Sequence, residues 1–137
     1  MNNFIDIEDI DSNQLKKIMA FSAGLKAERK NISKGTKDFK KHLTNKVVAL
    51  LFKKPSTRTR FSFEVGIFQM GGQTLTVSSN EMQISNFESM SDTARVLSQY
   101  LDMVVLRTDN HSDLIDLTNY SSIPIINGLS DKSHPCQ

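Results

Sequence analysis

The hydrophobic positions of the chain fall into short segments of strand length, separated by longer segments with helical periodicity. The strand-like segments are residues 47–52, 73–77, 103–106 and 123–126. The segments with helical spacing are residues 11–30, 56–70, 89–100 and 112–120. The first strand-like segment is continuously apolar, which is typical of a strand buried on both faces of a parallel sheet. The alternation predicts an α/β fold, an open parallel four-stranded sheet with helices on both faces.

Local signals refine these boundaries. Gln14 follows Asp11 at the spacing of a capping box, which predicts the start of a helix. Residues 31–45 are polar and rich in lysine, so we expect a surface connection or a short exposed helix there. Residues 56–70 carry apolar side chains on two faces, which predicts a buried helix. Pro124 fits only the start of a strand or a strand at the edge of the sheet, because it donates no ladder hydrogen bond.

The composition is that of one folded domain spanning residues 1–137. Hydrophobic residues make up 38% of the sequence, with 6 Gly and 3 Pro, which disfavours collagen-like, low-complexity and strongly disordered classes. The single Cys136 cannot form an internal disulfide, and no Cys/His pair has zinc-finger spacing, so we expect no metal and no cofactor. No segment has the pattern of a signal peptide or a membrane span, which favours a cytoplasmic protein without membrane contact.

Charge is distributed unevenly, although the net charge is only +2. Residues 1–60 contain 14 Lys/Arg and 6 Asp/Glu, whereas the rest of the chain contains 3 and 9. A basic half of this kind can attract an anion, an acidic protein or a nucleic acid. Its lysines are irregularly spaced and lack interleaved aromatic residues, which is typical of a solvated surface and does not favour a nucleic-acid partner.

The segment between the first predicted strand and the next helix concentrates hydrogen-bond donors. Its residues are Ser56, Thr57, Arg58, Thr59 and Arg60. A helix start offers unpaired backbone N–H groups and a partial positive charge, so anions bind there readily. Arg58 can add a bidentate contact to a phosphate. The spacing is not that of a Walker A loop, and a capped helix with two surface arginines would show the same residues.

Further donors follow the other predicted strands. Arg107 ends the third strand, while His134 and Gln137 come after the fourth, and Gln83 lies in the loop after the second. The carboxyl ends of parallel strands meet at one edge of the sheet, where ligands bind. A site made only of donors suits the stabilisation of charge on a phosphate and a carbonyl oxygen, which indicates acyl or carbamoyl transfer from a phosphorylated donor. A solvent-exposed Arg107 and a structural His134 are the alternatives.

The sequence resembles a known family along almost its whole length. The matching motifs are Phe52 with residues 55–64, then residues 92–97, then the His-Pro-Cys-Gln segment 134–137. These resemble the amino-terminal, carbamoyl-phosphate-binding domain of the aspartate/ornithine carbamoyltransferases. Residues 126–131 are similar to the ornithine members, and the loop 81–83 lacks the lysine expected of the aspartate members.

The resemblance implies a role for each donor. The residues that it assigns to the phosphate are Ser56, Thr57, Arg58 and Thr59. It implies that Thr59, Arg107 and His134 act in catalysis by polarising the carbamoyl oxygen, and that Gln137 accepts from the amide nitrogen. It further implies that family members are trimers in which Gln83 acts from a neighbouring subunit. Arg60 is expected to serve structure more than chemistry.

The implied reaction transfers the carbamoyl group of carbamoyl phosphate to the side-chain amine of L-ornithine, giving citrulline and phosphate. That activity belongs to ornithine metabolism and arginine biosynthesis. The family's second, amino-acid-binding domain is absent from residues 1–137, so we expect this chain to be the first part of a longer protein and not to be competent alone. The alternatives are an aspartate or other amino-acid carbamoyltransferase, or a non-catalytic phosphate-ligand module or assembly partner.

Overall fold

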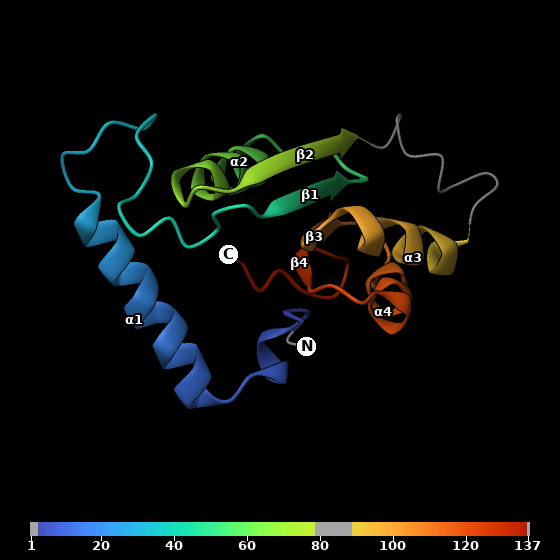
Figure 1. The fold of residues 1–137 in the computed structure, drawn as a ribbon. Coiled ribbons are helices and arrows are strands. Elements are labelled where there is room, and N and C mark those ends of the chain that lie inside the picture. Colours follow the sequence, from blue (N-terminus) through green and yellow to red (C-terminus); the bar gives the residue numbers. More distant parts are fainter. Residues whose placement is uncertain (1–2, 79–88, 137) are drawn as a thin grey trace.

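A parallel four-stranded sheet forms the centre of the computed structural model, which describes residues 3–78 and 89–136 (Figure 1). The strands are β1 (Val47–Phe52), β2 (Gln73–Ser78), β3 (Met103–Arg107) and β4 (Ile125–Leu129). Their order across the sheet is β2-β1-β3-β4. The helices are η1 (Ile7–Asp9), α1 (Ser12–Glu28), α2 (Thr57–Gln69), α3 (Met90–Tyr100) and α4 (His111–Tyr120). Among the described residues, no helix is long and apolar enough to cross a membrane.

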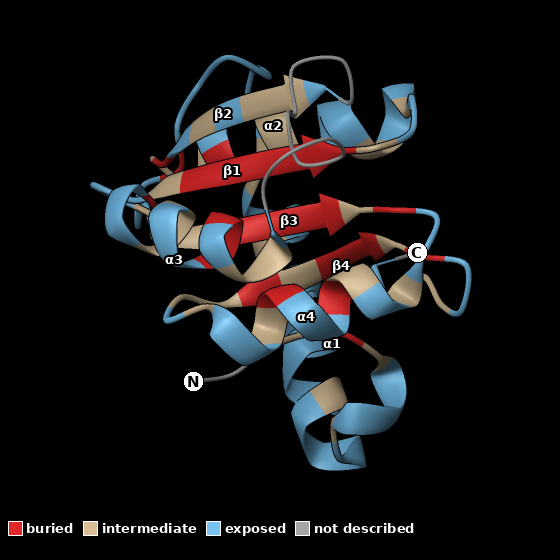
Figure 2. Ribbon diagram, turned by 90° about the vertical axis from the view of Figure 1, so that its right-hand side faces the viewer, coloured by how far each residue is buried: buried red, intermediate tan, exposed pale blue. Residues whose placement is uncertain are grey.

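Two hydrophobic clusters hold helices on opposite faces of the sheet. On one face, Ile67 of α2 packs with Val48, Leu50 and Val105. On the other face, α3 and α4 cover a cluster of buried residues that comprises Ile5, Ala49, Leu51, Ala94, Leu101, Val104, Leu106, Leu114, Leu117 and Ile125. The burial colours of Figure 2 show that β1 is buried along almost its whole length and β3 in its middle. The predicted open α/β sheet with helices on both faces is confirmed.

Most predicted boundaries agree with the structure within two residues. Asp11 caps α1 as expected, since its carboxylate accepts from the backbone N–H of Gln14 at 2.8 Å while the Gln14 side chain accepts from Asp11 N at 3.1 Å. The fourth strand begins two residues later than predicted, at Ile125. Pro124 precedes this edge strand, where the missing N–H costs no ladder hydrogen bond.

The prediction of a buried helix over residues 56–70 was wrong in its burial. Only Ile67 of α2 is buried, while Phe61 is 58% exposed and Val65 and Phe68 are each 41% exposed. The sheet covers one face of this helix, and the sequence carries a second apolar face that no described element covers. The apolar residues at helical spacing therefore form two faces of α2. One face packs against the core, and the other faces solvent or a partner.

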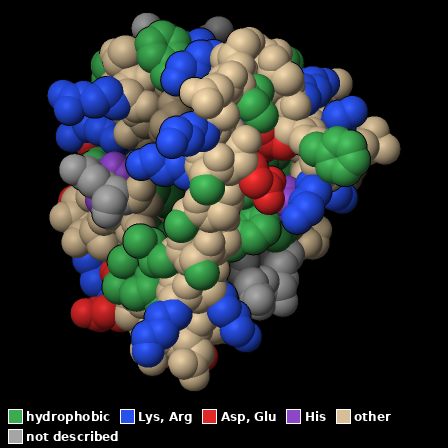
Figure 3. All heavy atoms as spheres, turned by 90° about the vertical axis from the view of Figure 1, so that its left-hand side faces the viewer, with side chains coloured by type: hydrophobic (Ala, Val, Ile, Leu, Met, Phe, Trp, Pro, Cys, Tyr) green, Lys and Arg blue, Asp and Glu red, His purple; other side chains and the backbone are tan. Residues whose placement is uncertain are grey.

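α1 stands apart from the sheet and has no buried residue (Figure 1). Its exposed apolar side chains include Ile18, Met19 and Phe21. Figure 3 shows hydrophobic side chains on this side of the molecule, bordered by lysine and arginine side chains. The connection that follows α1 consists of turns rather than a short helix, and Arg29 fastens it by pairing with the buried Asp38.

The register of the sheet aligns the ends of its central strands. Phe52 of β1 lies opposite Arg107 of β3, and the next residue, Lys53, donates its backbone N–H to the Arg107 carbonyl at 2.9 Å. After a register shift, Arg107 lies opposite Leu129 of β4. The loops that follow these three strands are therefore neighbours at the carboxyl edge of the sheet, as the parallel arrangement predicts.

Asn127 joins three segments beneath that edge. It is fully buried in β4, and its side-chain amide donates to the Ile5 carbonyl at 2.9 Å and the Ser133 carbonyl at 3.2 Å. Its side-chain oxygen accepts from Leu129 N at 2.9 Å. One side chain thus satisfies polar backbone groups of the amino-terminal segment, of β4 and of the turn that leads to His134.

We expect Asn127→Ala to lower the free energy of unfolding by about 2–3 kcal/mol, because buried backbone groups lose their partners and a cavity forms. Chemical denaturation followed by circular dichroism measures this change. Asn119→Ala, at an exposed position of α4, is the matched control and should change stability by less than about 0.5 kcal/mol. Equal effects of the two substitutions would contradict the role given to Asn127.

Candidate anion site at the carboxyl edge of the sheet

The site is built around the first turn of α2. Ser56 is the N-cap residue in extended backbone, and its hydroxyl makes no capping hydrogen bond with the residues that the structure describes. The first turn contains no acidic residue, so its partial positive charge is not neutralised from within the helix. The hydroxyl and the N–H groups of this turn are available to an external anion.

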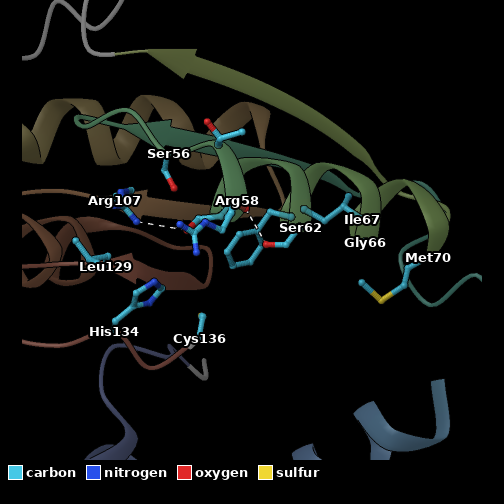
Figure 4. A pocket seen from close by; sticks show the side chains of 13 residues that line it. Ser56, Arg58, Ser62, Gly66, Ile67, Met70, Arg107, Leu129, His134 and Cys136 are labelled. Carbon is cyan, nitrogen blue, oxygen red and sulfur yellow. Dashed lines mark hydrogen bonds between the residues drawn. The ribbon is translucent and has the colours of Figure 1, made fainter. Parts of the chain in front are cut away.

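A pocket of about 850 Å³ opens over this turn (Figure 4). The residues that line it are Ser56, Thr57, Arg58, Thr59, Ser62, Phe63, Gly66, Ile67, Met70, Arg107, Leu129, His134 and Cys136. All six described residues that the sequence assigned to the site are among them. The two other predicted residues, Gln83 and Gln137, lie outside the described residues.

Arg107 reaches the α2 turn from the end of β3. Its Nη1 donates to the Thr59 hydroxyl at 3.4 Å, a weak contact that is drawn as a dashed line in Figure 4. Its buried Nε has no partner among the described residues. A buried donor without a partner costs free energy, and a bound acceptor would recover that cost. Arg107 Nε is therefore free to donate to an atom of a ligand.

His134 enters the pocket from the segment after β4. Burial lowers the pKa of His134, and the nearby Arg107 charge lowers it further, which favours the neutral imidazole near pH 7. The buried Nδ1 atom has no partner among the described residues. Figure 4 shows His134, Arg58 and Arg107 converging on one part of the pocket from three different segments.

The arrangement can bind and stabilise negative charge. Two guanidinium groups, four hydroxyls, an imidazole and a helix N-terminus surround the space, and no carboxylate of the described residues lines it. Such a set of fixed donors suits a phosphate and a carbonyl oxygen on which charge develops. The neutral His134 can donate one hydrogen bond without adding a third cation to the two arginines.

Arg60 lies outside this set, in agreement with the structural role expected for it. Its Nε donates to Glu64 Oε1 at 3.0 Å, and the same oxygen accepts from the Thr76 hydroxyl at 2.6 Å. The Thr76 hydrogen bond is the main cause that lowers the pKa of Glu64, with Arg60 adding to it. Glu64 thus ties α2 to β2, and Arg60 pairs with it from the same helix, while Arg58 lines the pocket.

Sequence reasoning missed the apolar wall of the pocket. Phe63, Ile67 and Met70 continue the helical face of Thr59 at intervals of three and four residues, a spacing that could have identified them. Leu129 was also missed, and it has the left-handed φ of 146°, which is rare for a residue with a side chain. No sequence signal marks this strain, because it arises from the hydrogen bonds that hold Leu129 between Asn127 and Thr108.

Replacing Arg107 with methionine should raise the pKa of His134 only part of the way toward its ordinary value of about 6.5, because burial is the larger cause and remains. NMR titration of the imidazole C–H signals measures the change. Arg95→Met, which removes a guanidinium from the exposed face of α3, is the matched control. An unchanged titration of His134 in the Arg107 variant would show that the two side chains do not interact.

The lowered pKa of His134 makes the stability of the folded chain depend on pH. The unfolded chain binds the His134 proton more readily than the folded chain, so this residue lowers the free energy of unfolding as the pH falls below about 6.5. The Arg107 variant should lose less stability over that range than the wild-type chain.

Comparison with known proteins agrees with this geometry. Residues 2–137 match the family model described as "Aspartate/ornithine carbamoyltransferase, carbamoyl-P binding domain". Ornithine carbamoyltransferases from Cereibacter sphaeroides and Ruegeria pomeroyi are 46% and 47% identical to the chain over 137 residues. The match covers 100% of this chain but only 44% of the length of either relative.

Solved structures give the same result for the fold. The ornithine carbamoyltransferase from Pyrococcus furiosus superposes with a TM-score of 0.90 at 37% identity, covering 98% of this chain and 42% of that protein. The anabolic ornithine carbamoyltransferase from Campylobacter jejuni superposes with a TM-score of 0.88 at 36% identity, again over 98% and 42%. The sheet and the helices described above therefore form a domain of known architecture.

Proposed function

The chain belongs to the aspartate/ornithine carbamoyltransferase family, and from this membership we propose that it supplies the carbamoyl phosphate half of an active site. In the complete protein, that site transfers the carbamoyl group to the side-chain amine of L-ornithine. Residues 1–137 form the carbamoyl-phosphate-binding domain, and a second domain supplies the amino-acid half. The relatives in which the matched segment is 44% of the length support this division.

The observation that carries the proposal is the convergence of donors from three segments on one pocket. Arg58 on α2, Arg107 at the end of β3 and His134 after β4 all line it. None of the three donors faces a carboxylate of the described residues within the pocket. A small dianion is the ligand class that such a pocket accommodates best, because it satisfies the charged donors and the helix N-terminus together.

The phosphate group binds at the start of α2. The residues that hold it are Ser56, Thr57, Arg58 and Thr59. Their hydroxyls and backbone N–H groups donate to the phosphate oxygens, and the Arg58 guanidinium adds a charged contact. The positive end of the helix favours both the bound substrate and the phosphate that leaves it.

The carbamoyl oxygen lies toward Thr59, Arg107 and His134. Attack of the neutral ornithine amine on the carbonyl carbon places negative charge on this oxygen in a tetrahedral intermediate. The three donors stabilise that charge, each by about 3 kcal/mol if it acts like a typical oxyanion donor. Collapse of the intermediate breaks the bond between the carbonyl carbon and the bridging oxygen, releasing phosphate and leaving citrulline, and the proton of the attacking amine passes to the leaving phosphate. Gln137 accepts a hydrogen bond from the carbamoyl NH₂ group.

Assignment of ornithine as the acceptor rests on the relatives and on two segments of sequence. The relatives named above are ornithine carbamoyltransferases. Residues 126–131 are similar to the ornithine members, and residues 81–83 lack the lysine expected of aspartate members. A cytoplasmic enzyme of arginine biosynthesis is the role that fits this acceptor.

The proposal extends to a homotrimer in which Gln83 reaches the site of a neighbouring subunit. The second apolar face of α2 supports such an assembly. Phe61, Val65 and Phe68 are exposed there, and Leu75 of the edge strand β2 is 54% exposed. These residues lie on α2 and on β2, which contacts α2. A subunit that covered them would therefore also border the pocket, which opens over the first turn of α2.

Arg58→Ala should weaken carbamoyl phosphate binding at least about tenfold, because a charged hydrogen bond to an anion contributes about 1.5–3 kcal/mol. Isothermal titration calorimetry on the 137-residue chain measures the affinity. Arg60→Ala is the matched control, since it removes the same charged group two residues away but outside the pocket, and it should change the affinity less than twofold. Equal affinity of wild type and the Arg58 variant would remove Arg58 from the site.

The complete protein should carbamoylate L-ornithine, and residues 1–137 alone should turn over negligibly, because the attacking amine is not held beside the bound substrate. Citrulline formation measures the first activity, and carbamoyl aspartate formation tests the alternative acceptor in the same preparation. Preference for aspartate would overturn the acceptor assignment. Appreciable citrulline from residues 1–137 alone would overturn the division of the site between two domains.

A further inference from the structure

Two successive lysines cross from the end of β1 to acidic residues that follow β3. Lys53 Nζ donates to Asp113 Oδ2 at 2.8 Å, in a pair whose side chains are only 30% and 19% exposed. Lys54 pairs with Asp109, where both side chains are more than half exposed. The structure thus joins the end of β1 twice to the segment that follows β3, once in a partly buried pair and once at the surface.

The partly buried Lys53–Asp113 pair belongs to a larger network. Asp113 lies in the first turn of α4, and its Oδ2 atom also accepts from the Thr108 hydroxyl at 2.5 Å. Thr108 is fully buried, and its backbone N–H donates to the carbonyl of the strained Leu129 at 3.0 Å. A single carboxylate oxygen therefore connects the end of β1, the end of β3 and, through Thr108, the end of β4.

Arg107 is adjacent to both residues whose side chains donate to this oxygen, Lys53 and Thr108. The Arg107 carbonyl accepts from Lys53 N, and Thr108 is the next residue along the chain. Lys53 is also the first residue after β1 in the loop that leads to Ser56 and the start of α2. The network holds the backbone on both sides of the pocket, although neither Asp113 nor Lys53 lines the pocket itself.

We propose that Asp113 is a positioning residue, which through Lys53 and Thr108 fixes the separation between the α2 anion-binding turn and Arg107. Stability alone gives a weak reason for such a pair, because the partial desolvation of two charges offsets much of their attraction. Geometry gives a stronger one. The turn and Arg107 are both cationic and repel each other when no anion is bound, and a fixed link keeps them at the separation that a shared ligand needs.

The experiment compares Asp113→Ala with Asp109→Ala, which breaks the exposed pair in the same loops. Isothermal titration calorimetry with carbamoyl phosphate should show about tenfold weaker binding for Asp113→Ala and less than a twofold change for Asp109→Ala. Asp113→Asn should recover most of the affinity, because both hydrogen bonds end on one oxygen that an amide can replace. Weaker binding of equal size in the Ala variants at positions 113 and 109 would overturn the proposal.

The proposal rests on the proposed function for its ligand, so a second measurement uses no ligand. Hydrogen exchange of the free chain should be about tenfold faster at the Lys53 and Thr108 amides in Asp113→Ala, while the amides of Val104 and Val105 in the middle of β3 keep their wild-type rates. If the alanine variant is too unstable to purify, Lys53→Met takes its place. This substitution removes the other partner of the Lys53–Asp113 pair and should give the same faster exchange. Unchanged exchange at both amides would overturn the positioning role.

The two measurements separate the possible failures. A wild-type chain that binds no carbamoyl phosphate would contradict the proposed function, and the exchange rates would still decide whether Asp113 fixes the two loops. A chain that binds carbamoyl phosphate equally well with and without Asp113 would leave the proposed function standing and remove Asp113 from it.

Discussion

The parallel pairing of β1 with β3 is the constraint on which the rest of the molecule depends. The pairing places Phe52 opposite Arg107. Because α2 begins a few residues after Phe52, this register brings the positive end of a helix beside a strand-end arginine. A shift of one residue would turn the Arg107 side chain to the other face of the sheet and leave the α2 turn without its partner. The Lys53–Asp113 ion pair and the segment after β4 that carries His134 are placed around this pairing.

The pocket carries several unfavourable features of the folded chain together. Arg107 and His134 each have a buried nitrogen without a partner among the described residues, and Leu129 adopts a strained φ. Outside the pocket, the buried Asn127 has its hydrogen bonds satisfied, whereas the hydroxyls of Thr93 in α3 and Thr118 in α4 have no partner among the described residues. Unsatisfied donors and backbone strain at one place are typical of a site shaped for a ligand, because binding recovers part of their cost.

The sequence was sufficient to predict the fold and most of the polar residues that line the pocket. Apolar runs and helical periodicity identified the strands and helices, since the buried strands of a parallel sheet differ plainly from their surroundings. The donors at residues 56–59, with Arg107 and His134, followed from their places after predicted strands. The burial of α2 could not be predicted, because its two apolar faces look alike in sequence and only tertiary packing distinguishes them.

Other parts of the site depend on contacts between distant residues, which no local pattern reveals. Leu129 is strained because Asn127 and Thr108 bind its backbone. Asp113 gave no signal, since an acidic residue in the first turn of a helix is common and its partner Lys53 is 60 residues away. These residues act through geometry rather than by a motif, so a structure was needed to find them.

A crystal structure with a non-hydrolysable phosphonate analogue of carbamoyl phosphate tests the central claim most directly. The account predicts the phosphonate oxygens within hydrogen-bond distance of the α2 turn at residues 56–59, with the carbonyl oxygen of the same molecule facing Arg107 and His134. An analogue bound elsewhere, or bound at the α2 turn with its carbonyl directed away from both side chains, would contradict a shared anion site.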